Sequence, residues 1–351
     1  MSRFLSSKYS GLSPYVPGEQ PRDRRYIKLN TNESPFPPGA KVTEAVKNET
    51  SSMNLYPDPD YKALREKLSA LTGVAQDELI MTNGSDEILD LCFMAFCDSD
   101  TPAVFADITY GFYEVFSQIN LLPYRKIPLR DDMSIDVKDY YYAKGTIFIA
   151  NPNAPTGLLL TLSEIRDILE HNRKNVVVID EAYIAFGGES AAELIGGYDN
   201  LVVTRTFSKS RSLAGGRIGF GIANKGLIDD LNRIRNSLNP YNLSRINAAA
   251  AIGAIEDNDY YLSNIEKIKA VREKTRAELI KEGFEVTDSK ANFLFARTDR
   301  MGGKELYQKL REKGILVRHF DRDRIRDYIR ITIGSEEQMD IFMDKIKEIL
   351  D

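Results

Sequence analysis

The chain has 351 residues, and its 47 Lys and Arg against 52 Asp and Glu give a formal net charge of −5. This balance excludes a sequence-wide attraction to nucleic acid or anionic lipid. Hydrophobic residues make up 42% of the chain and charged residues 28%, which excludes intrinsic disorder. At roughly 150 residues per domain, the length predicts about two domains with cores that need no disulfides.

Cysteine and histidine are scarce. Cys92 and Cys97 are the only cysteines, which excludes a disulfide framework and indicates a reducing compartment. Both lie in an apolar helical stretch, so we expect them in the core. His171 and His319 are the only histidines, and these few scattered ligands make no convincing zinc site, so no metal is predicted.

Residues 1–26 contain no apolar segment of the kind found in signal peptides. No run of about 18 apolar residues occurs anywhere in the chain, so we predict no membrane-spanning helix. We therefore expect a cytoplasmic protein.

The first 40 residues are rich in Pro, Gly, Ser and Asn. The segment Asn30–Gly39 cannot be helical, because its prolines remove backbone donors and fix φ. We interpret residues 1–40 as an ordered arm.

From about residue 60 the pattern is that of an α/β protein. Leucines 64, 68 and 71 have helical spacing, and Gly73 ends that helix. A strand at 79–81, a polar turn and a helix resuming at Ile88 follow. Further short apolar runs predict strands at 103–105, 146–150, 176–179 and 201–204, with a helix at 163–174 before the third of them. Such alternation predicts a mainly parallel sheet with helices on both faces.

After about residue 255 the pattern changes. A long charged helix is predicted at about 257–282, and strands are predicted at 284–286, 292–296, 314–318 and 328–333. A capping-box pattern at Ser335–Gln338 opens the last helix. We expect a large domain at 41–255 and a smaller α+β domain at 256–351, with the arm of residues 1–40 packing on the smaller one.

Polar groups follow three of the predicted parallel strands. They are the segments Asn151–Gly157, Asp180–Tyr183 and Arg205–Arg217. Ligands of open α/β sheets bind beyond the carboxyl ends of the strands, so these segments are expected to form one site.

Lys209 is the most informative residue of this group. A lysine in a partly dry site loses its proton readily and can condense with an aldehyde. Pyridoxal phosphate needs such a lysine, a carboxylate at its ring nitrogen and a cradle for its phosphate. Asp180 could supply the carboxylate. The cradle could be formed by Thr206, Ser208, Arg217 and the backbone N–H groups at the helix start Gly84-Ser85-Asp86.

The chain then resembles a known family. The segments NPNAPTG, DEAY and TFSKSRSLAGGRIGF are similar to those of fold-type-I pyridoxal-phosphate aminotransferases. The segments LSPYVPGE, KLNTNESPFPP, NLYPDP and YIRITIG resemble the histidinol-phosphate aminotransferase group in particular. The resemblance extends from about residue 12 to 334. It implies a fold with a large domain, built on a mainly parallel central sheet, and a smaller α+β domain.

The resemblance implies a role for each matching residue around the cofactor ring. Lys209 bonds to the cofactor aldehyde and then moves the proton at the substrate Cα. Asp180 pairs with the ring nitrogen, and Tyr110 stacks on the ring. Tyr183 and Asn153 hydrogen-bond the phenolic oxygen of the ring.

The resemblance also implies the phosphate and substrate sites. The phosphate is held by Gly84, Ser85, Asp86, Thr206, Ser208 and Arg217. Tyr56 is expected to reach the phosphate in the neighbouring subunit, which implies a homodimer with shared active sites. Arg330 is expected to bind the anionic group of the substrate, and Asn32 is expected to contact the substrate. Arg318 and Tyr15 are expected to complete a pocket for the substrate phosphate and the distal carboxylate of glutamate.

Two positions depart from the family pattern. Ala154 stands where the family usually has Asn, and Ser210-Arg211-Ser212 stands where Ala-Phe-Gly is frequent. Arg211 is expected to add a positive charge near the mouth of the pocket.

The implied reaction interconverts two pairs of compounds by moving one amino group. L-histidinol phosphate and 2-oxoglutarate give imidazole-acetol phosphate and L-glutamate, a step of histidine biosynthesis. Two alternatives keep the cofactor: an aromatic amino-acid aminotransferase and a threonine-phosphate decarboxylase. A more distant alternative is a non-catalytic ligand-binding module, although the chain has no G-x-G-x-x-G after a strand and no G-x-x-x-x-G-K-[ST].

Simpler interpretations exist for single residues. Tyr110 and Tyr183 could be core aromatics, since the chain has 18 tyrosines. Asp180 could cap a helix, and Arg318 and Arg330 could form surface ion pairs.

Overall fold

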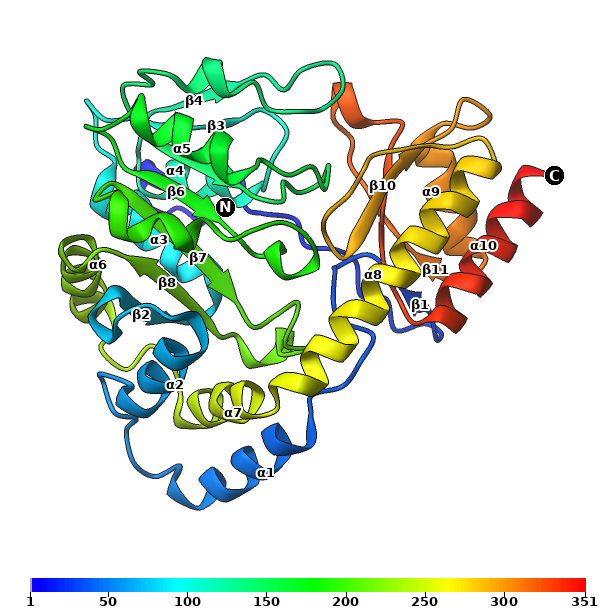
Figure 1. Ribbon diagram of the computed structural model, residues 1–351. Helices are drawn as coiled ribbons and strands as arrows, with labels where there is room; N and C mark the ends of the chain where they lie inside the picture. Colours follow the sequence, from blue (N-terminus) through cyan, green and yellow to red (C-terminus); the bar gives the residue numbers. More distant parts are fainter. Residues whose placement is uncertain (1) are drawn as a thin grey trace.

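The computed structural model describes residues 2–351, which form two bodies joined by a long helix (Figure 1). The larger body is built on a seven-stranded sheet with the order β2-β8-β7-β6-β5-β3-β4. Its strands are β2 (Leu79–Thr82), β3 (Ala103–Ala106), β4 (Tyr124–Ile127), β5 (Thr146–Ala150), β6 (Val177–Asp180), β7 (Leu201–Thr206) and β8 (Gly219–Ala223). Only β8 runs against its neighbours β2 and β7, so the predicted mainly parallel α/β sheet is confirmed.

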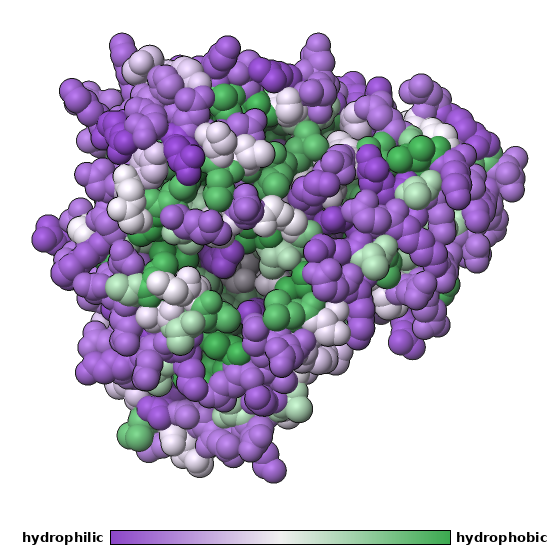
Figure 2. All heavy atoms as spheres, in the orientation of Figure 1, coloured by the Kyte–Doolittle hydropathy of each residue, from purple (hydrophilic) through white to green (hydrophobic). Residues whose placement is uncertain are grey.

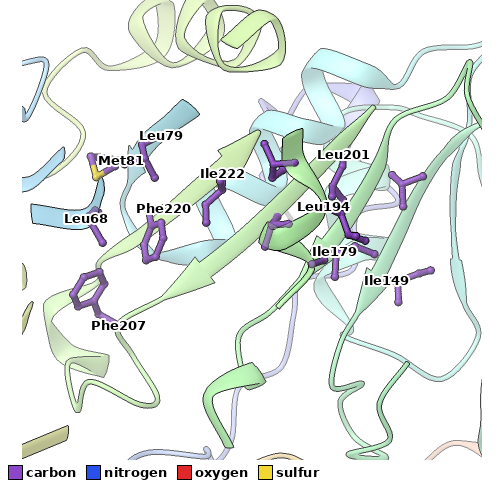
Figure 3. Close-up of a cluster of buried hydrophobic side chains, with 14 of the residues drawn as sticks. Leu68, Leu79, Met81, Ile149, Ile179, Leu194, Leu201, Phe207, Phe220 and Ile222 are labelled. Atoms are coloured by element: carbon purple, nitrogen blue, oxygen red, sulfur yellow. The ribbon is translucent and has the colours of Figure 1, made fainter. Parts of the chain in front are cut away.

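Helices cover both faces of this sheet. They are α1 (Ala40–Glu49), α2 (Lys62–Thr72), α3 (Gly84–Phe96), α4 (Phe112–Ile119), α5 (Leu162–Glu170), α6 (Lys225–Leu238) and α7 (Arg245–Glu256). The central strands are apolar on both faces of the sheet. Alternate residues point to opposite faces, and each face is covered by helices. Ile149 and Ile179 pack on the face covered by α1, α2, α5 and α7, part of which Figure 3 shows. Phe148 and Val178 pack against α3, α4 and α6.

The smaller body contains a four-stranded sheet with the order β12-β13-β10-β9 and a two-stranded pair β1-β11. The strands are β1 (Ile27–Lys28), β9 (Glu285–Val286), β10 (Phe293–Arg297), β11 (Ile315–Leu316), β12 (Arg318–His319) and β13 (Ile329–Thr332). Its helices are α8 (Asn258–Lys281), α9 (Gly303–Glu312) and α10 (Glu336–Leu350). Helix α8 extends from α7 to the smaller body (Figure 1).

The N-terminal arm is tied to the smaller body. Strand β1 pairs in parallel with β11, and the carbonyl of Leu29 accepts a hydrogen bond from the N–H of Thr332 (2.9 Å). These contacts favour the predicted packing of residues 1–40 on the smaller domain, whose limits stay a prediction.

Several local predictions can be compared with the structure. Gly73 ends α2 in the left-handed conformation (φ 76°), and Ser335 forms the capping box of α10. Cys92 and Cys97 are buried free thiols, as predicted for core residues.

Two local predictions are wrong. The strand predicted at 314–318 is split, because β11 pairs with β1 whereas β12 pairs with β13. The helix predicted to end at residue 174 ends at Glu170. Asn172 is buried there, and its side chain bonds the carbonyls of Tyr140 and Ile168 and the N–H of Ala143, which holds the chain in a turn.

The surface seen in Figure 2 is largely hydrophilic at its rim, whereas apolar residues gather in the middle of this face. No helix within residues 2–351 combines the length and the apolar character needed to cross a membrane.

Gly219 at the start of β8 permits a close backbone approach to the start of α3. A Cβ at this position would lie 2.4 Å from the carbonyl carbon of Gly84 and 2.6 Å from the nitrogen of Ser85. We predict that Gly219→Ala lowers the free energy of unfolding by about 1–3 kcal/mol, because rigid backbone must move. Denaturant unfolding measures this loss. Gly196→Ala is the control, since a Cβ there meets no atom within 4 Å, and equal stability of the two variants would contradict the prediction.

Candidate active site

A cavity of about 830 Å³ lies beyond the carboxyl ends of β5, β6 and β7 and is closed on the other side by the smaller body and the arm. Most of the site residues predicted from the sequence line it: Tyr15, Asn32, Ser85, Asp86, Tyr110, Asp180, Tyr183, Thr206, Ser208, Lys209, Arg217, Arg318 and Arg330. The structure therefore brings together residues from the two bodies and from the arm.

Asp180 is the last residue of β6 and is buried, with 5% of its surface exposed. Its carboxylate accepts hydrogen bonds from the hydroxyls of Tyr113 (3.1 Å) and Thr204 (3.1 Å) and from the N–H of Ala182 (3.3 Å). Burial nevertheless raises the pKa of Asp180 to about 6, because the charged form is poorly solvated. The site holds a carboxylate that lacks a cationic partner among residues 2–351.

Lys209 follows β7 and is the amine of the cavity. Its Nζ donates a hydrogen bond to the carbonyl of Thr31 in the arm (3.1 Å) and lies 5.8 Å from the ring centre of Tyr183. Burial lowers the pKa of Lys209 to about 8, and the positive charge of Arg330 acts in the same direction. The amine is therefore easier to deprotonate than an exposed lysine.

A cluster of hydroxyl, guanidinium and backbone N–H donors surrounds the first turn of α3. Gly84 opens this helix at φ 76°, and a Cβ there would lie 2.6 Å from the guanidinium of Arg217, so glycine admits this arginine. Ser208 is buried and lies within hydrogen-bond distance of Thr206 (Oγ to Oγ1, 3.0 Å). Helix starts and arginines bind phosphate groups, so this donor set suits a phosphomonoester.

Asp86 organises one edge of this cradle. Its carboxylate accepts hydrogen bonds from the hydroxyl of Tyr110 (2.7 Å) and from the guanidinium of Arg217 (2.8 Å). The ring of Tyr110 packs edge-on against Tyr113, with centres 5.8 Å apart. Tyr110 is thereby fixed at the wall of the cavity between the cradle and Asp180.

The opposite wall comes from the arm and the smaller body. Asn32 donates from its side-chain amide to the hydroxyl of Tyr183 (3.0 Å). The Nε of Arg330 is buried and has no hydrogen-bond partner in the part of the chain that the structure describes. Arg330 also lies over the ring of Phe293, 5.3 Å from its centre. An unpaired guanidinium donor beside the amine of Lys209 suits an anionic ligand.

Arg318 lines the cavity but is engaged by the arm. Its guanidinium donates to the carbonyls of Val16 (2.7 Å) and Pro17 (3.0 Å). The ring of Tyr15 stacks on Phe112 of α4, with centres 4.3 Å apart. The arm therefore crosses from the smaller body to the larger one at the mouth of the cavity.

Three residues predicted for the site, Gly84, Asn153 and Tyr56, do not line the cavity. Gly84 lies behind Ser85 and Arg217. Asn153 is buried. Its side-chain amide is hydrogen-bonded to Ile108, Thr156 and Thr109. Its contact with a ligand stays a prediction.

Tyr56 lies on the surface of the chain, with 76% of its surface exposed. Its ring stacks on Tyr241, and its carbonyl accepts a hydrogen bond from Arg245 (3.1 Å). Tyr56 therefore takes no part in the cavity of its own chain.

The prediction for Arg211 is wrong. Arg211 does not stand at the mouth of the cavity but points towards the junction of α7 and α8, where it donates to the carbonyl of Ala254 (3.3 Å) and lies over Tyr261. Ala154, the other departure from the family pattern, is a buried residue of the cavity wall.

Sequence reasoning missed several residues of the site. Tyr113 and Thr204 bind Asp180, and Arg322 and Phe320 line the mouth. The register of the predicted strands could have identified Thr204, because Thr204 pairs with Asp180 in adjacent parallel strands. Tyr113 has no such signal, since its sequence neighbours form an ordinary amphipathic helix.

Among residues 2–351 no group of three or more His, Cys, Asp and Glu side chains could hold a metal ion. The buried carboxylate, the amine and the phosphate cradle together fit pyridoxal phosphate instead, whose ring nitrogen, aldehyde and phosphate need these three partners.

Comparisons with known proteins agree with this fit. Residues 24–346 match the family model described as aminotransferase class I and II. The chain is 49% identical to the histidinol-phosphate aminotransferase of Brachyspira hyodysenteriae, covering 100% of this chain and 99% of that protein. It is 45% identical to that of Clostridium acetobutylicum, over 100% of both chains.

Solved structures share the fold. The histidinol-phosphate aminotransferase of Sinorhizobium meliloti in complex with pyridoxal-5'-phosphate superposes with a TM-score of 0.90 at 24% identity, over 99% of both chains. The L-threonine-O-3-phosphate decarboxylase of Porphyromonas gingivalis gives a TM-score of 0.79 at 23% identity, over 92% of this chain and 99% of that chain. The chain is thus a pyridoxal-phosphate-dependent enzyme that belongs to the class I and II aminotransferases and, within them, to the histidinol-phosphate aminotransferase family.

Proposed function

We propose that the protein transfers the amino group between L-histidinol phosphate and 2-oxoglutarate, giving imidazole-acetol phosphate and L-glutamate, as a step of histidine biosynthesis. The observation that carries this proposal is the 49% identity over the full chain to a protein of that name. The arginines of the cavity agree with it, because both amino donors are anions.

We propose the following partners for the cofactor among the residues of the cavity. Lys209 would join its aldehyde, Asp180 would pair with its ring nitrogen, and Ser85, Thr206, Ser208 and Arg217 would bind its phosphate. When bound, pyridoxal phosphate supplies a ring that takes up the negative charge left when the substrate Cα loses its proton. The carboxylate of Asp180 keeps the ring nitrogen protonated, which strengthens this effect.

Lys209 carries the proton during the reaction. Its Nζ acts as a base when it takes the proton from the substrate Cα, and it acts as an acid when it gives that proton up later in the transfer. In the chain without cofactor, burial lowers the pKa of Lys209 to about 8, so its amine gives up a proton more readily than that of an exposed lysine. Arg330 orients the substrate by its anionic group, and Tyr15 with the arm limits the access of water.

The alternatives have less support. The decarboxylase shares the fold at 23% identity, which carries no information on the reaction. A non-catalytic binding module would have no need of an amine with a lowered pKa opposite a buried carboxylate. The same cavity chemistry also suits an aromatic amino-acid substrate, and a comparison of amino donors separates the two.

We further propose a cytoplasmic homodimer in which Tyr56 completes the phosphate site of the partner subunit. Exposed apolar side chains near Tyr56 support an interface there: Met53 (65%), Leu55 (58%), Leu238 (62%) and Tyr241 (40%). The two free buried thiols are compatible with a reducing compartment. We also propose the domain limits 1–40, 41–255 and 256–351.

The reaction is tested with four amino donors and 2-oxoglutarate as the acceptor. We predict that kcat/KM for L-histidinol phosphate exceeds the values for phenylalanine, tyrosine and threonine phosphate. Lys209→Ala serves as the blank, because it lacks the amine that moves the proton. A higher kcat/KM for phenylalanine would overturn the substrate, and release of carbon dioxide from threonine phosphate without an acceptor would overturn the reaction.

The lowered pKa of Lys209 predicts how covalent attachment of the cofactor depends on pH. A group with a pKa of about 8 is protonated below this pH and neutral above it. At saturating pyridoxal phosphate, we expect the attachment rate of the apoprotein to rise about tenfold from pH 7 to pH 9 and then to level off. Borohydride trapping followed by peptide mass analysis measures the rate. A rate that still rises steeply above pH 9 would show an ordinary lysine.

A further inference from the structure

Arg322 is a cationic side chain at the mouth of the cavity. Arg322 follows β12 and lines the cavity, and it makes no ion pair or side-chain hydrogen bond within residues 2–351. Other arginines of the same loop are engaged, since Arg324 pairs with Asp107 (3.1 Å) and Arg326 pairs with Asp323. The charge of Arg322 is therefore available to a ligand.

The position of Arg322 is defined by two contacts at the turn before α4. A Cβ placed on Gly111 would lie 3.9 Å from a guanidinium nitrogen of Arg322 and 3.5 Å from the ring of Tyr15. Arg322 and Tyr15 thus converge on this turn from the smaller body and from the arm. The turn directly follows Tyr110, which stands at the wall of the cofactor site.

The nearby acidic groups form no ion pair with Arg322 among residues 2–351. Glu114 of α4 also lines the cavity, and its carboxylate is bound by Lys126 (2.7 Å) and by the hydroxyl of Tyr124 (2.9 Å). Burial acts to raise the pKa of Glu114, but these hydrogen bonds lower it overall, and the charge of Arg322 adds only a minor contribution in the same direction. Asp321 is the exposed neighbour of Arg322 in sequence, and the two side chains form no ion pair in the described part of the chain.

Arg330 and Arg322 lie at different depths. The charge of Arg330 acts on Lys209, so Arg330 is close to the place where the substrate Cα must react. Arg322 is exposed at the mouth. Both arginines line the same cavity, so one substrate can meet Arg330 with its first anionic group and Arg322 with the end of its side chain.

The two amino donors of the proposed function differ in that side chain. Next to Cα, L-glutamate carries a carboxylate and L-histidinol phosphate carries a phosphoryloxymethyl group, so both place an anion near Arg330. Their side chains end in a carboxylate and in an imidazole, respectively. A positive charge at the mouth favours the carboxylate and gives nothing to the neutral imidazole.

We propose that Arg322 is a specificity residue that binds the distal carboxylate of glutamate and 2-oxoglutarate, and that it serves this half of the reaction alone. The inference rests on the proposed function, because that function defines the two donors. Arg322 makes the same contact in the bound substrate and in the transition state, so its loss raises KM and leaves kcat largely unchanged.

The experiment compares single-turnover kinetics of the holoenzyme with each donor. In Arg322→Gln we expect kcat/KM for L-glutamate to fall about fivefold, the effect of one exposed ion pair of about 1 kcal/mol. The value for L-histidinol phosphate stays within about twofold, because its side chain makes no ion pair. Arg322→Glu, which reverses the charge, lowers the value for glutamate further.

Arg326→Gln is the matched control, because it removes one positive charge from the same loop outside the cavity. It is expected to leave both donors unchanged. An equal loss for both donors in Arg322→Gln, or a larger loss for L-histidinol phosphate, would overturn the inference. If the unmodified enzyme reacts with neither donor, the proposed function fails instead, so the two failures are distinguishable.

Discussion

A carboxylate buried without a cationic partner is the constraint on which the site depends. Asp180 stands at the end of a central strand, and three hydrogen bonds do not fully replace the water it loses, as its raised pKa of about 6 shows. A protonated ring nitrogen placed against it offsets this cost in a medium of low dielectric constant. The fold therefore presents a buried charge to the cavity, and the proposed position of the cofactor ring follows from it.

The other groups of the site line the same cavity as Asp180. Three parallel strands end at one edge of the sheet, which places Asp180, Lys209 and the phosphate cradle within a single cavity. The smaller body and the arm close the other side, where they contribute Arg330 and Asn32. Arg318 holds the arm through hydrogen bonds to two of its carbonyls. The residues that anchor the arm and those proposed to bind the substrate therefore lie on the same wall of the cavity.

Sequence reasoning predicted the residues whose place depends on the chain path. Asp180 ends β6, and Lys209 and Arg217 lie in the segment after β7. The carboxyl ends of parallel strands meet at one edge of a sheet. Residues whose role depends on side-chain direction were harder to predict. Tyr113 lies in an ordinary helix yet points to Asp180, Arg211 turns away to α7, and Arg322 reaches the mouth from a loop without regular spacing. The split between β11 and β12 was hidden because the apolar run continues while the pairing partner changes.

The central claim is tested most directly by Asp180→Asn. The pKa of Asp180 in the folded chain, about 6, lies above the usual value of 3.8. The ionised carboxylate therefore lowers the free energy of unfolding at pH 7.5, and this loss becomes smaller as the pH falls below 6. At pH 7.5 the account predicts that the apoprotein becomes more stable, by up to about 3 kcal/mol in the free energy of unfolding. The dissociation constant for pyridoxal phosphate should increase at least about tenfold, because the ring nitrogen loses its counter-charge. An apoprotein that is destabilised while its affinity for the cofactor is unchanged would contradict the account.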